Sequence, residues 1–507
     1  MSAPAVRLQK ICKAFGPVQA NSDIDLQIAS GSIHGIIGEN GAGKSTLVSI
    51  LYGFYTADSG TVEIDGTAVR IGGPSDAIEH GIGMVHQHFM LVPTFTVLEN
   101  VMLGSEGGAL LRSGADTMRA ELLRLEEEYG LQVDPDALVG DLPVGLQQRV
   151  EILKALLRGA RILILDEPTG VLTPDETDRL FDILRGLRDA GTTILLITHK
   201  LREIMEVCDA VSVMRRGKMV GHRTPKDSSR EELAELMVGR KVLLEAHRSD
   251  VAAGDVVLSA NGLTARDPGG APRLLDVSLE LRAGEILGVA GVSGNGQSAL
   301  LDVLSGIEPV QEGVVDLLGR QIDRTHPCPP AQMREIGLAH VPEDRHRRGL
   351  ILPFEARENA VLGYHDGDDA GQGRFTDPKA MQALTETLME RFDVRPPDPR
   401  LAAKGFSGGN QQKIVIAREI EAAPRVLLIG QPTRGVDIGA IEFIHSQIVA
   451  LKEQGCAVLL VSVELDEILA LSDRIMVMNA GRVVGTLPRE EADHRKLGLM
   501  MAGEAAA

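Results

Sequence analysis

A glycine-rich segment, Gly38–Thr46, has the residue types and spacing needed to bind phosphate groups. It reads GENGAGKST and follows the apolar run Ile33–Ile37. Its glycines would let backbone N–H groups surround the phosphates, and a helix starting near Lys44 would point its positive end at them. Lys44 would reach the β- and γ-phosphates, and Ser45 would ligate Mg²⁺. The segment therefore predicts a P-loop that binds a nucleoside triphosphate with Mg²⁺.

Two adjacent carboxylates, Asp166 and Glu167, could supply the chemistry of hydrolysis. They end the apolar run ILIL, which puts them at the edge of a sheet, where the phosphates lie in a P-loop protein. Asp166 suits a metal ion, and Glu167 suits orienting or deprotonating the attacking water. On its own, such a pair is usually only a polar strand end. In the string ILILDEPT, downstream of a P-loop, it is expected to be a catalytic pair.

Three further candidates are weak when each is taken alone. His199 follows the run ILLIT, and such a histidine is more often structural than catalytic. Gln87 stands between two histidines with no distinguishing pattern. Phe15, upstream of the P-loop, could stack on an adenine, although a single phenylalanine is more often part of a core.

The chain contains one pattern twice, in the same order and at a nearly constant offset. GENGAGKST recurs as GVSGNGQSA at Gly291–Ala299, LPVGLQQR as FSGGNQQK at Phe406–Lys413, and ILILDEPT as VLLIGQPT at Val426–Thr433. We therefore expect two tandem domains, 1–245 and 256–507, joined by a short linker at 246–255.

Each copy has the pattern of an α/β domain. The runs Ile33–Ile37, Ile162–Leu165 and Ile194–Ile197 are expected to be buried strands that alternate with helices. Val62–Gly66 and Val211–Val220 are expected to form hairpins. Residues 95–158 have Leu, Glu and Arg at helical spacing, which predicts a helical subdomain.

Composition argues against a nucleic-acid-binding, zinc-binding, disulfide-bonded or membrane-spanning protein. A net charge of −19, 3% aromatic residues and no Trp argue against nucleic-acid binding, and the basic run Arg345–Arg348 is expected to be a solvated loop. Four widely separated cysteines without a CxxC pair indicate neither a zinc site nor disulfides. No apolar run is long enough to span a bilayer, and the N-terminus does not resemble a secretory signal.

Taken together, the motifs resemble those of ATP-binding-cassette (ABC) ATPases from end to end. The resemblance implies two P-loop cassettes, each with a RecA-like core, an antiparallel β subdomain and a helical subdomain. It implies that Phe15 stacks on adenine, that Gln87 senses the membrane subunit and ligates Mg²⁺, and that His199 contacts the γ-phosphate. It also implies that each ATP is completed by the signature turn of the opposite cassette. The residues expected to contact ATP are Phe15, Gly38, Glu39, Asn40, Gly41, Ala42, Gly43, Lys44, Ser45 and Thr46 of one cassette, with Ser407, Gly408, Gly409 and Asp437 of the other.

The two copies differ in ways that predict only one hydrolytic site. The second copy has Gln297 for Lys44, Glu343 for Gln87, Gly430 and Gln431 for the carboxylate pair, and Val463 for His199. In the first copy, Pro143 replaces the signature serine, and Thr173 stands where the second copy has Asp437. By the family's head-to-tail arrangement, all these losses damage one composite site. The degenerate pocket would consist of Gly291, Gly294, Gly296, Gln297, Ser298 and Gln431.

Fused cassettes resemble the energy subunits of bacterial importers for monosaccharides and nucleosides. Strings such as MVHQHFMLVPTFTVLEN and HVPEDRHRRGL look most like the nucleoside importers that use a lipoprotein-type binding protein. The resemblance implies permease partners, an indirect role for a solute-binding protein, no contact with the solute and a peripheral place on the cytoplasmic face of the inner membrane. The alternatives are a pentose or hexose importer, a soluble twin-cassette factor acting on ribosomes, and a non-hydrolysing scaffold.

Overall fold

The computed structural model describes residues 3–86, 89–104, 111–170, 172, 174–241, 251–292, 294–364, 377–436 and 438–503. They fall into two compact units, Met1–Val242 and Leu243–Ala507. The predicted linker begins among residues 242–250, which lie outside the described residues. The predicted domain boundaries at 245 and 256 therefore stay a prediction.

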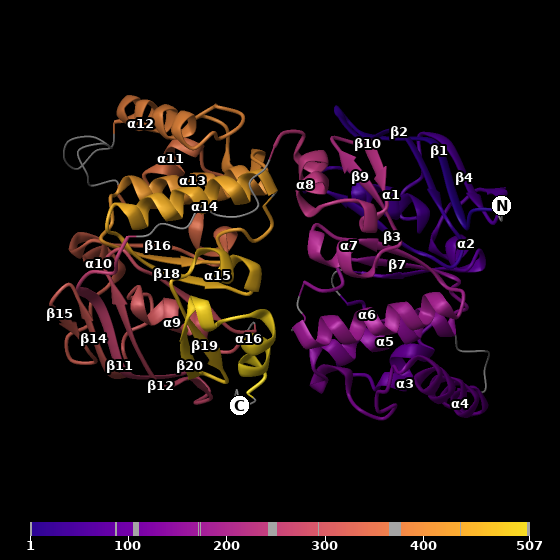
Figure 1. The fold of residues 1–507 in the computed structure, drawn as a ribbon, viewed down its shortest axis with the longest axis horizontal. Helices are drawn as coiled ribbons and strands as arrows, with labels where there is room; N and C mark the ends of the chain where they lie inside the picture. Colours follow the sequence, from indigo (N-terminus) through magenta and orange to yellow (C-terminus); the bar gives the residue numbers. More distant parts are fainter. Residues whose placement is uncertain are drawn as a thin grey trace. The chain divides into compact units, whose positions relative to one another are not determined.

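The first unit contains two sheets and the helices that cover them (Figure 1). A 4-stranded antiparallel sheet has the order β2-β1-β4-β5, and a 6-stranded sheet has the order β10-β9-β3-β8-β7-β6. The strands are β1 (Val6–Phe15), β2 (Val18–Ile28), β3 (Ile33–Gly38), β4 (Ser59–Ile64), β5 (Thr67–Val69), β6 (Ile82–Val85), β7 (Ile162–Asp166), β8 (Thr193–Ile197), β9 (Ala210–Arg215) and β10 (Lys218–Arg223). The helices are α1 (Lys44–Leu51), α2 (Pro74–Glu79), α3 (Val97–Met102), α4 (Leu111–Tyr129), α5 (Val144–Leu157), α6 (Pro174–Asp189), α7 (Leu201–Val207) and α8 (Arg230–Val238).

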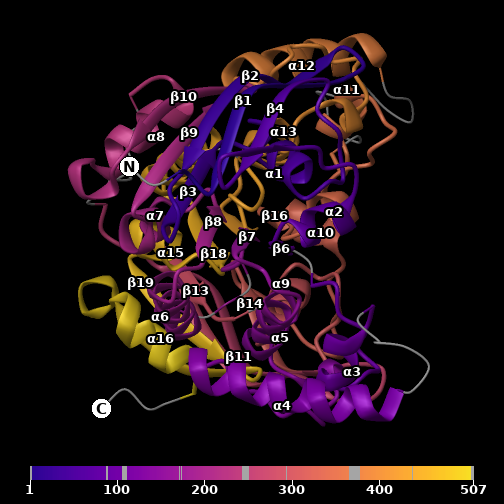
Figure 2. The same cartoon turned by 90° about the vertical axis from the view of Figure 1, so that its right-hand side faces the viewer.

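The predicted elements of the first unit are confirmed. The three apolar runs form β3, β7 and β8, which are parallel neighbours. Both predicted hairpins exist, β4 with β5 and β9 with β10, although the second belongs to the large sheet. Helices α3 and α4 lie at one end of the unit and β1, β2 and β4 at the other (Figure 2).

The second unit repeats this architecture element by element. Its sheets have the orders β12-β11-β14-β15 and β16-β17-β18-β13-β19-β20. The strands are β11 (Val256–Arg266), β12 (Pro272–Arg282), β13 (Ile286–Ala290), β14 (Glu312–Leu317), β15 (Arg320–Ile322), β16 (Leu338–Val341), β17 (Val426–Gly430), β18 (Ala457–Ser462), β19 (Arg474–Asn479) and β20 (Arg482–Pro488). The helices are α9 (Gln297–Leu304), α10 (Pro330–Ile336), α11 (Ala356–Ala360), α12 (Pro378–Arg391), α13 (Gly408–Glu421), α14 (Ile438–Glu453), α15 (Leu465–Leu471) and α16 (His494–Met501).

Each central sheet is buried on both faces, which explains why its strands are continuous apolar runs. In β17, Leu427 and Ile429 pack into one core with α13 and α14, whereas Val426 and Leu428 pack into another with α9. Packing on both faces fixes the position of the last residue of the strand. The sheet can therefore place the residues that follow each strand with little freedom.

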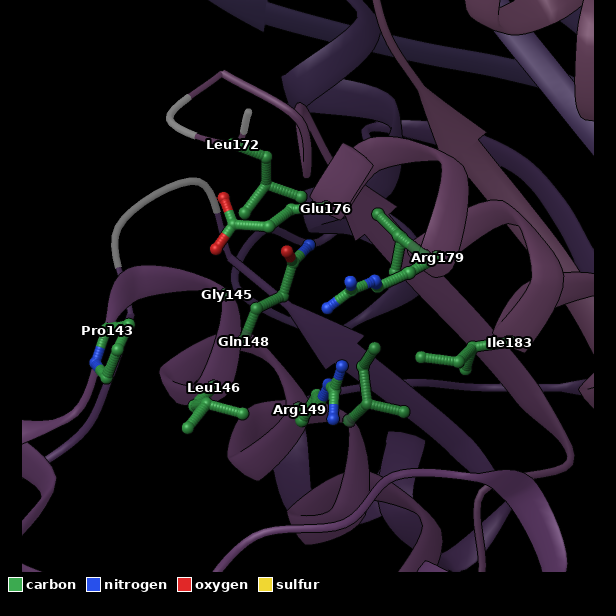
Figure 3. A pocket seen from close by; sticks show the side chains of 11 residues that line it. Pro143, Gly145, Leu146, Gln148, Arg149, Leu172, Glu176, Arg179 and Ile183 are labelled. Carbon is green, nitrogen blue, oxygen red and sulfur yellow. The ribbon is translucent and has the colours of Figure 1, made fainter. Parts of the chain in front are cut away.

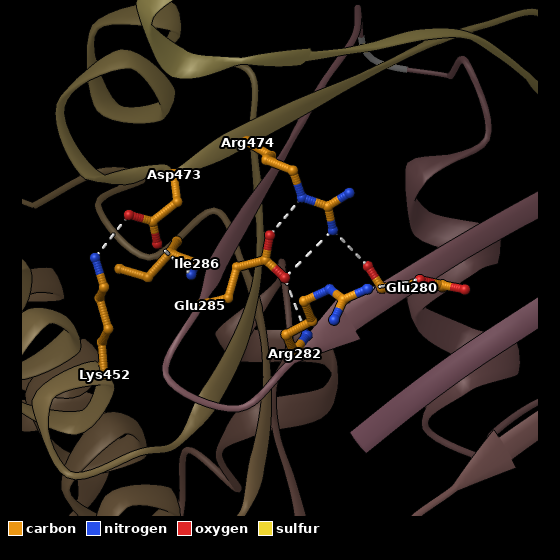
Figure 4. Close-up of polar contacts among 7 residues, drawn as sticks. All are labelled: Glu280, Arg282, Glu285, Ile286, Lys452, Asp473 and Arg474. Atoms are coloured by element: carbon orange, nitrogen blue, oxygen red, sulfur yellow. Dashed lines mark hydrogen bonds and ion pairs between the residues drawn. The ribbon is translucent and has the colours of Figure 1, made fainter. Parts of the chain in front are cut away.

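A carboxylate fixes the start of each P-loop strand in the same way. Asp473 accepts a hydrogen bond from the Ile286 backbone N at 2.8 Å and one from Lys452 Nζ at 2.7 Å (Figure 4). In the first unit, Asp209 accepts from the Ile33 backbone N at 2.9 Å. These contacts anchor β13 and β3 at the ends opposite their glycine-rich turns.

Candidate nucleotide-binding site

The glycine-rich turn of the first unit connects β3 to α1, as predicted. A Cβ on Gly38 would come within 2.3 Å of the Met214 carbonyl oxygen. Gly43 has a φ of +100°, and a Cβ there would come within 2.3 Å of the Ala20 carbonyl oxygen. Only glycine fits these two positions, so the backbone can make the tight turn that opens helix α1 at Lys44.

Lys44 is buried inside this turn. Its Nζ donates hydrogen bonds to the carbonyl oxygens of Gly38 at 2.7 Å and Glu39 at 3.1 Å. Burial lowers the pKa of Lys44, and the nearby carboxylates of Glu167 and Asp166 partly offset that effect. The turn therefore concentrates one positive charge next to the carboxylate pair.

The sheet register brings the hydrolytic candidates to one edge. Asp166 ends β7 opposite Ile197, the last residue of β8. Glu167 has a φ of +48°, and its backbone N donates to the Ile197 carbonyl oxygen at 2.8 Å. His199 Nδ1 then donates a hydrogen bond to Glu167 Oε1 at 2.9 Å. The weak histidine candidate is thus joined directly to the carboxylate predicted to act on water.

The two carboxylates have opposite electrostatic properties. Burial, and then repulsion from Glu167, raise the pKa of Asp166 to about 6, against the opposing effect of Lys44. Burial would also raise the pKa of Glu167, but the hydrogen bond and charge of His199, with Lys44, bring that pKa below its usual value. Glu167 is therefore ionised at neutral pH. The ionised form of Asp166 is disfavoured by burial and by the charge of Glu167, so a bound cation would stabilise it.

The donor set fits Mg²⁺. The Ser45 hydroxyl and the Asp166 carboxylate are oxygen ligands of the kind that Mg²⁺ takes, and Asp166 gains from a neighbouring cation. The third predicted ligand, Gln87, lies outside the described residues.

Glu203 is a residue of this site that the sequence did not single out. It is buried on α7 and accepts a hydrogen bond from Thr169 Oγ1, which ties the turn after Glu167 to the helix after His199. Burial raises the pKa of Glu203. The sequence could have indicated Glu203, because it is an acidic residue on the apolar side of a short helix.

The second unit keeps the backbone of this site but not its side chains. Gln431 has the same φ of +48° as Glu167, and its backbone N donates to the Val461 carbonyl oxygen at 2.7 Å. Its side-chain Oε1 accepts from the Val463 backbone N at 3.2 Å, so an amide–backbone contact replaces the carboxylate–histidine pair. Gln297 is buried like Lys44 but carries no charge.

The basic run in the second unit is exposed at His346, Arg347 and Arg348, as expected, but it forms a helical turn and not a loop. Residues Arg345–Gly349 form a π-helix whose side chains reach three elements. Arg345 Nη1 donates to the Arg434 carbonyl oxygen at 2.7 Å, and Arg348 Nη1 donates to Asp302 on α9. His346 Nε2 pairs with Gln411 Oε1 on α13 at 2.7 Å. The prediction of a loop was wrong because partners far along the chain, the buried Asp302 and Gln411 among them, hold these side chains.

Different charged side chains lie against the two signature turns. At the second unit's turn, a Cβ on Gly408 would lie 2.7 Å from Arg345 Nη2, so a guanidinium lies against the turn. Ser407, the residue before α13, accepts through Oγ from Asn410 Nδ2 at 2.9 Å. The predicted neighbour Gly409 is buried in the first turn of α13.

The first unit's turn lines a cavity of about 270 Å³ at the start of α5 (Figure 3). Pro143 precedes the helix, with neither a hydroxyl nor a backbone N–H. A Cβ on Gly145 would lie 2.6 Å from Glu176 Oε1, so a carboxylate lies against this turn. Arg149 and Arg179 line the same cavity, so the first unit's turn is not surrounded by negative charge alone (Figure 3). The clearest difference between the two turns is Ser407 in the second unit against Pro143 in the first.

The remaining predicted residues are placed as follows. Phe15 ends β1 with 41% of its surface exposed and packs edge-on against Tyr55 at 5.1 Å between ring centroids, so it is not a core residue. Asp437 and Thr173, on which the trans-acting prediction also rests, lie outside the described residues. Within the described ranges, the structure has no helix long and apolar enough to cross a membrane.

Two P-loop turns on duplicated α/β cores, each followed by a signature helix, define a protein with two nucleotide-binding cassettes of the P-loop type. The ABC transporter family model matches residues 21–170 and 274–434. The chain belongs to this family.

The chain also aligns over nearly its whole length with several named relatives. It is 44% identical to the nucleoside import ATP-binding protein NupA of Lactococcus lactis, covering 98% of each chain. It is 45% identical to the guanosine import ATP-binding protein NupO of Bacillus subtilis, covering 98% of this chain and 97% of that one. It is equally 45% identical to the glucose import ATP-binding protein TsgD13 of Haloferax volcanii, covering 99% of this chain and 96% of that one.

Proposed function

We propose that this chain is the ATP-hydrolysing subunit of an importer that carries nucleosides, and that it hydrolyses ATP at one site only. The observation that carries the proposal is the cluster of Lys44, Asp166, Glu167 and His199 at one sheet edge of the first unit. The second unit has no counterpart of this cluster at the matching positions.

In this proposal each residue of the first unit has a defined task. The turn Gly38–Thr46 and Lys44 bind the phosphates of ATP. Ser45 and Asp166, with Gln87, hold Mg²⁺, which neutralises charge on the phosphates when it is bound. His199 orients Glu167, and the ionised carboxylate of Glu167 orients the attacking water and accepts its proton.

The second unit is proposed to complete this site through its signature turn. Ser407 and Gly409 would offer a hydroxyl and a backbone N–H to the γ-phosphate, and Asp437 would act beside them. The guanidinium of Arg345 against Gly408 supports this assignment, because it makes the turn attractive to an anion. Pro143, which offers neither a hydroxyl nor a backbone N–H at the first unit's turn, supports the absence of a second hydrolytic site.

The proposed partners are the permease subunits of the importer, which would dock near Gln87 and Glu343 at the cytoplasmic face of the membrane. A solute-binding protein would act indirectly, and the solute itself would not touch this chain. Nucleosides are proposed as cargo because two of the three relatives named above are nucleoside or guanosine importers. TsgD13, at the same identity, supports a hexose as the second candidate.

ATP turnover of Glu167→Gln tests the site assignment. We expect turnover to fall roughly 10²–10⁴-fold, the scale for removal of a general base, while ATP binding persists. The matched control is Gln431→Glu, which puts a carboxylate at the same backbone position of the second unit. It is expected to leave turnover unchanged, because Gln297 and Val463 still lack the charge and the imidazole.

Near-normal turnover in Glu167→Gln would reject the single-site assignment. The same assay on the complex with its permeases and binding protein, in lipid, separates the two cargoes. Stimulation by a nucleoside but not by glucose supports the proposal, and the reverse selects the hexose importer.

A further inference from the structure

The second unit keeps a phosphate-binding turn although it has lost the lysine. Gly294 and Gly296 have φ values of +94° and +106°, close to those of the first unit's turn. A Cβ on Gly296 would come within 2.8 Å of the Arg273 carbonyl oxygen. Helix α9 then begins at Gln297, as α1 begins at Lys44. The described part of this turn, residues 294–297, therefore enters its helix as residues 41–44 do in the first unit.

A carboxylate also lies at the metal position of this pocket, but it comes from a different strand. Gly430 ends β17 where Asp166 ends β7, so the expected acidic side chain is missing. A Cβ on Gly430 would come within 2.5 Å of Glu343 Cγ. Glu343, which follows β16, therefore fills the space that an aspartate at position 430 would need.

The Glu343 carboxylate also contacts the second metal-ligand position. Ser298 Oγ, the counterpart of Ser45, donates a hydrogen bond to Glu343 Oε2. Hydroxyl and carboxylate oxygens thus meet beside the phosphate-binding turn. These are the oxygen ligand types that Mg²⁺ uses together with substrate phosphates.

We propose that the second unit binds a Mg²⁺–nucleoside triphosphate without hydrolysing it, with Glu343 and Ser298 as the protein ligands of the metal. The inference rests on the proposed function in taking ATP as the nucleotide. Hydrolysis does not follow, because Gln431 is an amide that accepts from the Val463 backbone N, and Val463 stands where the first unit has His199.

The charge balance gives this site a property that the first site lacks. Gln297 donates through Nε2 to the Val292 carbonyl oxygen at 3.1 Å, in the same place as the Lys44–Glu39 contact, but brings no positive charge. The carboxylate of Glu343 would then repel the phosphates unless a divalent cation lies between them. Nucleotide binding in the second unit is therefore strictly dependent on Mg²⁺, whereas Lys44 supports binding in the first unit without it.

The test is equilibrium dialysis of the full chain with radiolabelled ATP, in a Glu167→Gln background so that ATP is not consumed. We expect two equivalents of ATP per chain with Mg²⁺ and one with EDTA. Adding Glu343→Gln should weaken the second equivalent at least about tenfold in Mg²⁺, the scale of lost metal affinity on altering a metal site. It should also remove the difference between Mg²⁺ and EDTA for that equivalent.

Glu335→Gln, at an exposed position of the same unit, is the matched control and should retain both equivalents. Retention of the first equivalent in Glu343→Gln shows in the same sample that the variant is folded. A single equivalent in Mg²⁺, or a second one indifferent to Glu343→Gln, would overturn the proposal. Loss of the first equivalent instead would count against the proposed function and not against this pocket alone.

Discussion

Replacing Asp166 by Asn should make the first unit more stable while abolishing its activity. The structure holds this carboxylate in a buried position next to Glu167, which raises its pKa to about 6. An acid whose pKa is raised by folding releases its proton more readily from the unfolded chain. The ionised carboxylate therefore destabilises the folded state as the pH rises from the unfolded pKa towards the folded one. Asparagine keeps the shape and removes the charge.

The size of the effect follows from the shift. The pKa moves from the usual 3.8 to about 6. Each unit corresponds to 1.36 kcal/mol, so Asp166→Asn should stabilise the first unit by up to about 3 kcal/mol above pH 6. Between pH 6 and pH 4 the gain should shrink steadily, because the folded wild-type carboxyl takes up a proton over this range and no longer carries a buried charge.

Hydrogen exchange of amides in β7 and β8 measures this gain within the first unit, which matters because a chain with two units need not unfold in one step. Wild type and variant are compared at the same pH, so intrinsic exchange rates cancel. Asp178→Asn, at a position whose side chain is 55% exposed on α6, is the matched control and should change protection little. Equal or weaker protection in Asp166→Asn at pH 8 would refute the electrostatic reasoning.

Two other substitutions test the remaining contacts. Arg345→Ala removes the guanidinium from the second unit's signature turn. We expect ATP turnover to fall roughly 10²-fold, the scale for one preorganised donor, while the first equivalent of ATP still binds. Unchanged turnover would show that Arg345 is not part of the proposed composite site. Thr169→Val deprives the buried Glu203 of one hydroxyl donor and leaves Thr198 as the other. We expect local destabilisation of about 1–3 kcal/mol, read from exchange in β7 and α7; full protection there would show that this contact does not hold the turn.

The sequence was sufficient for the scaffold of the site. The apolar run before Gly38 and the run before Asp166 each predict a buried strand with its functional residue at the carboxyl end. Because parallel strands end at one edge, the meeting of Lys44 with Asp166 and Glu167 could be predicted without coordinates. The repeated order of motifs predicted the same strands and turns in the second unit.

Contacts between side chains far apart along the chain could not be predicted from the sequence. Nothing in the letters RHRR shows that Arg345 lies against Gly408, because that contact depends on a π-helix and on the start of α13. Likewise, Gly430 looks like the simple loss of a metal ligand. Only packing reveals that Glu343, which follows another strand, occupies the same space.

The retained backbone of the second unit bears on what its pocket does. Gln431 keeps the left-handed conformation of Glu167, at a cost of order 1–3 kcal/mol for a residue with a side chain. Its hydrogen bond to the end of β18 matches the bond of Glu167 to the end of β8. The hydrolytic side chains are absent from this pocket. If the pocket had no function at all, we would not expect residue 431 to keep this unfavourable conformation. A strained turn, two left-handed glycines and a carboxylate at the metal position are instead what a site needs in order to hold a nucleotide without turning it over.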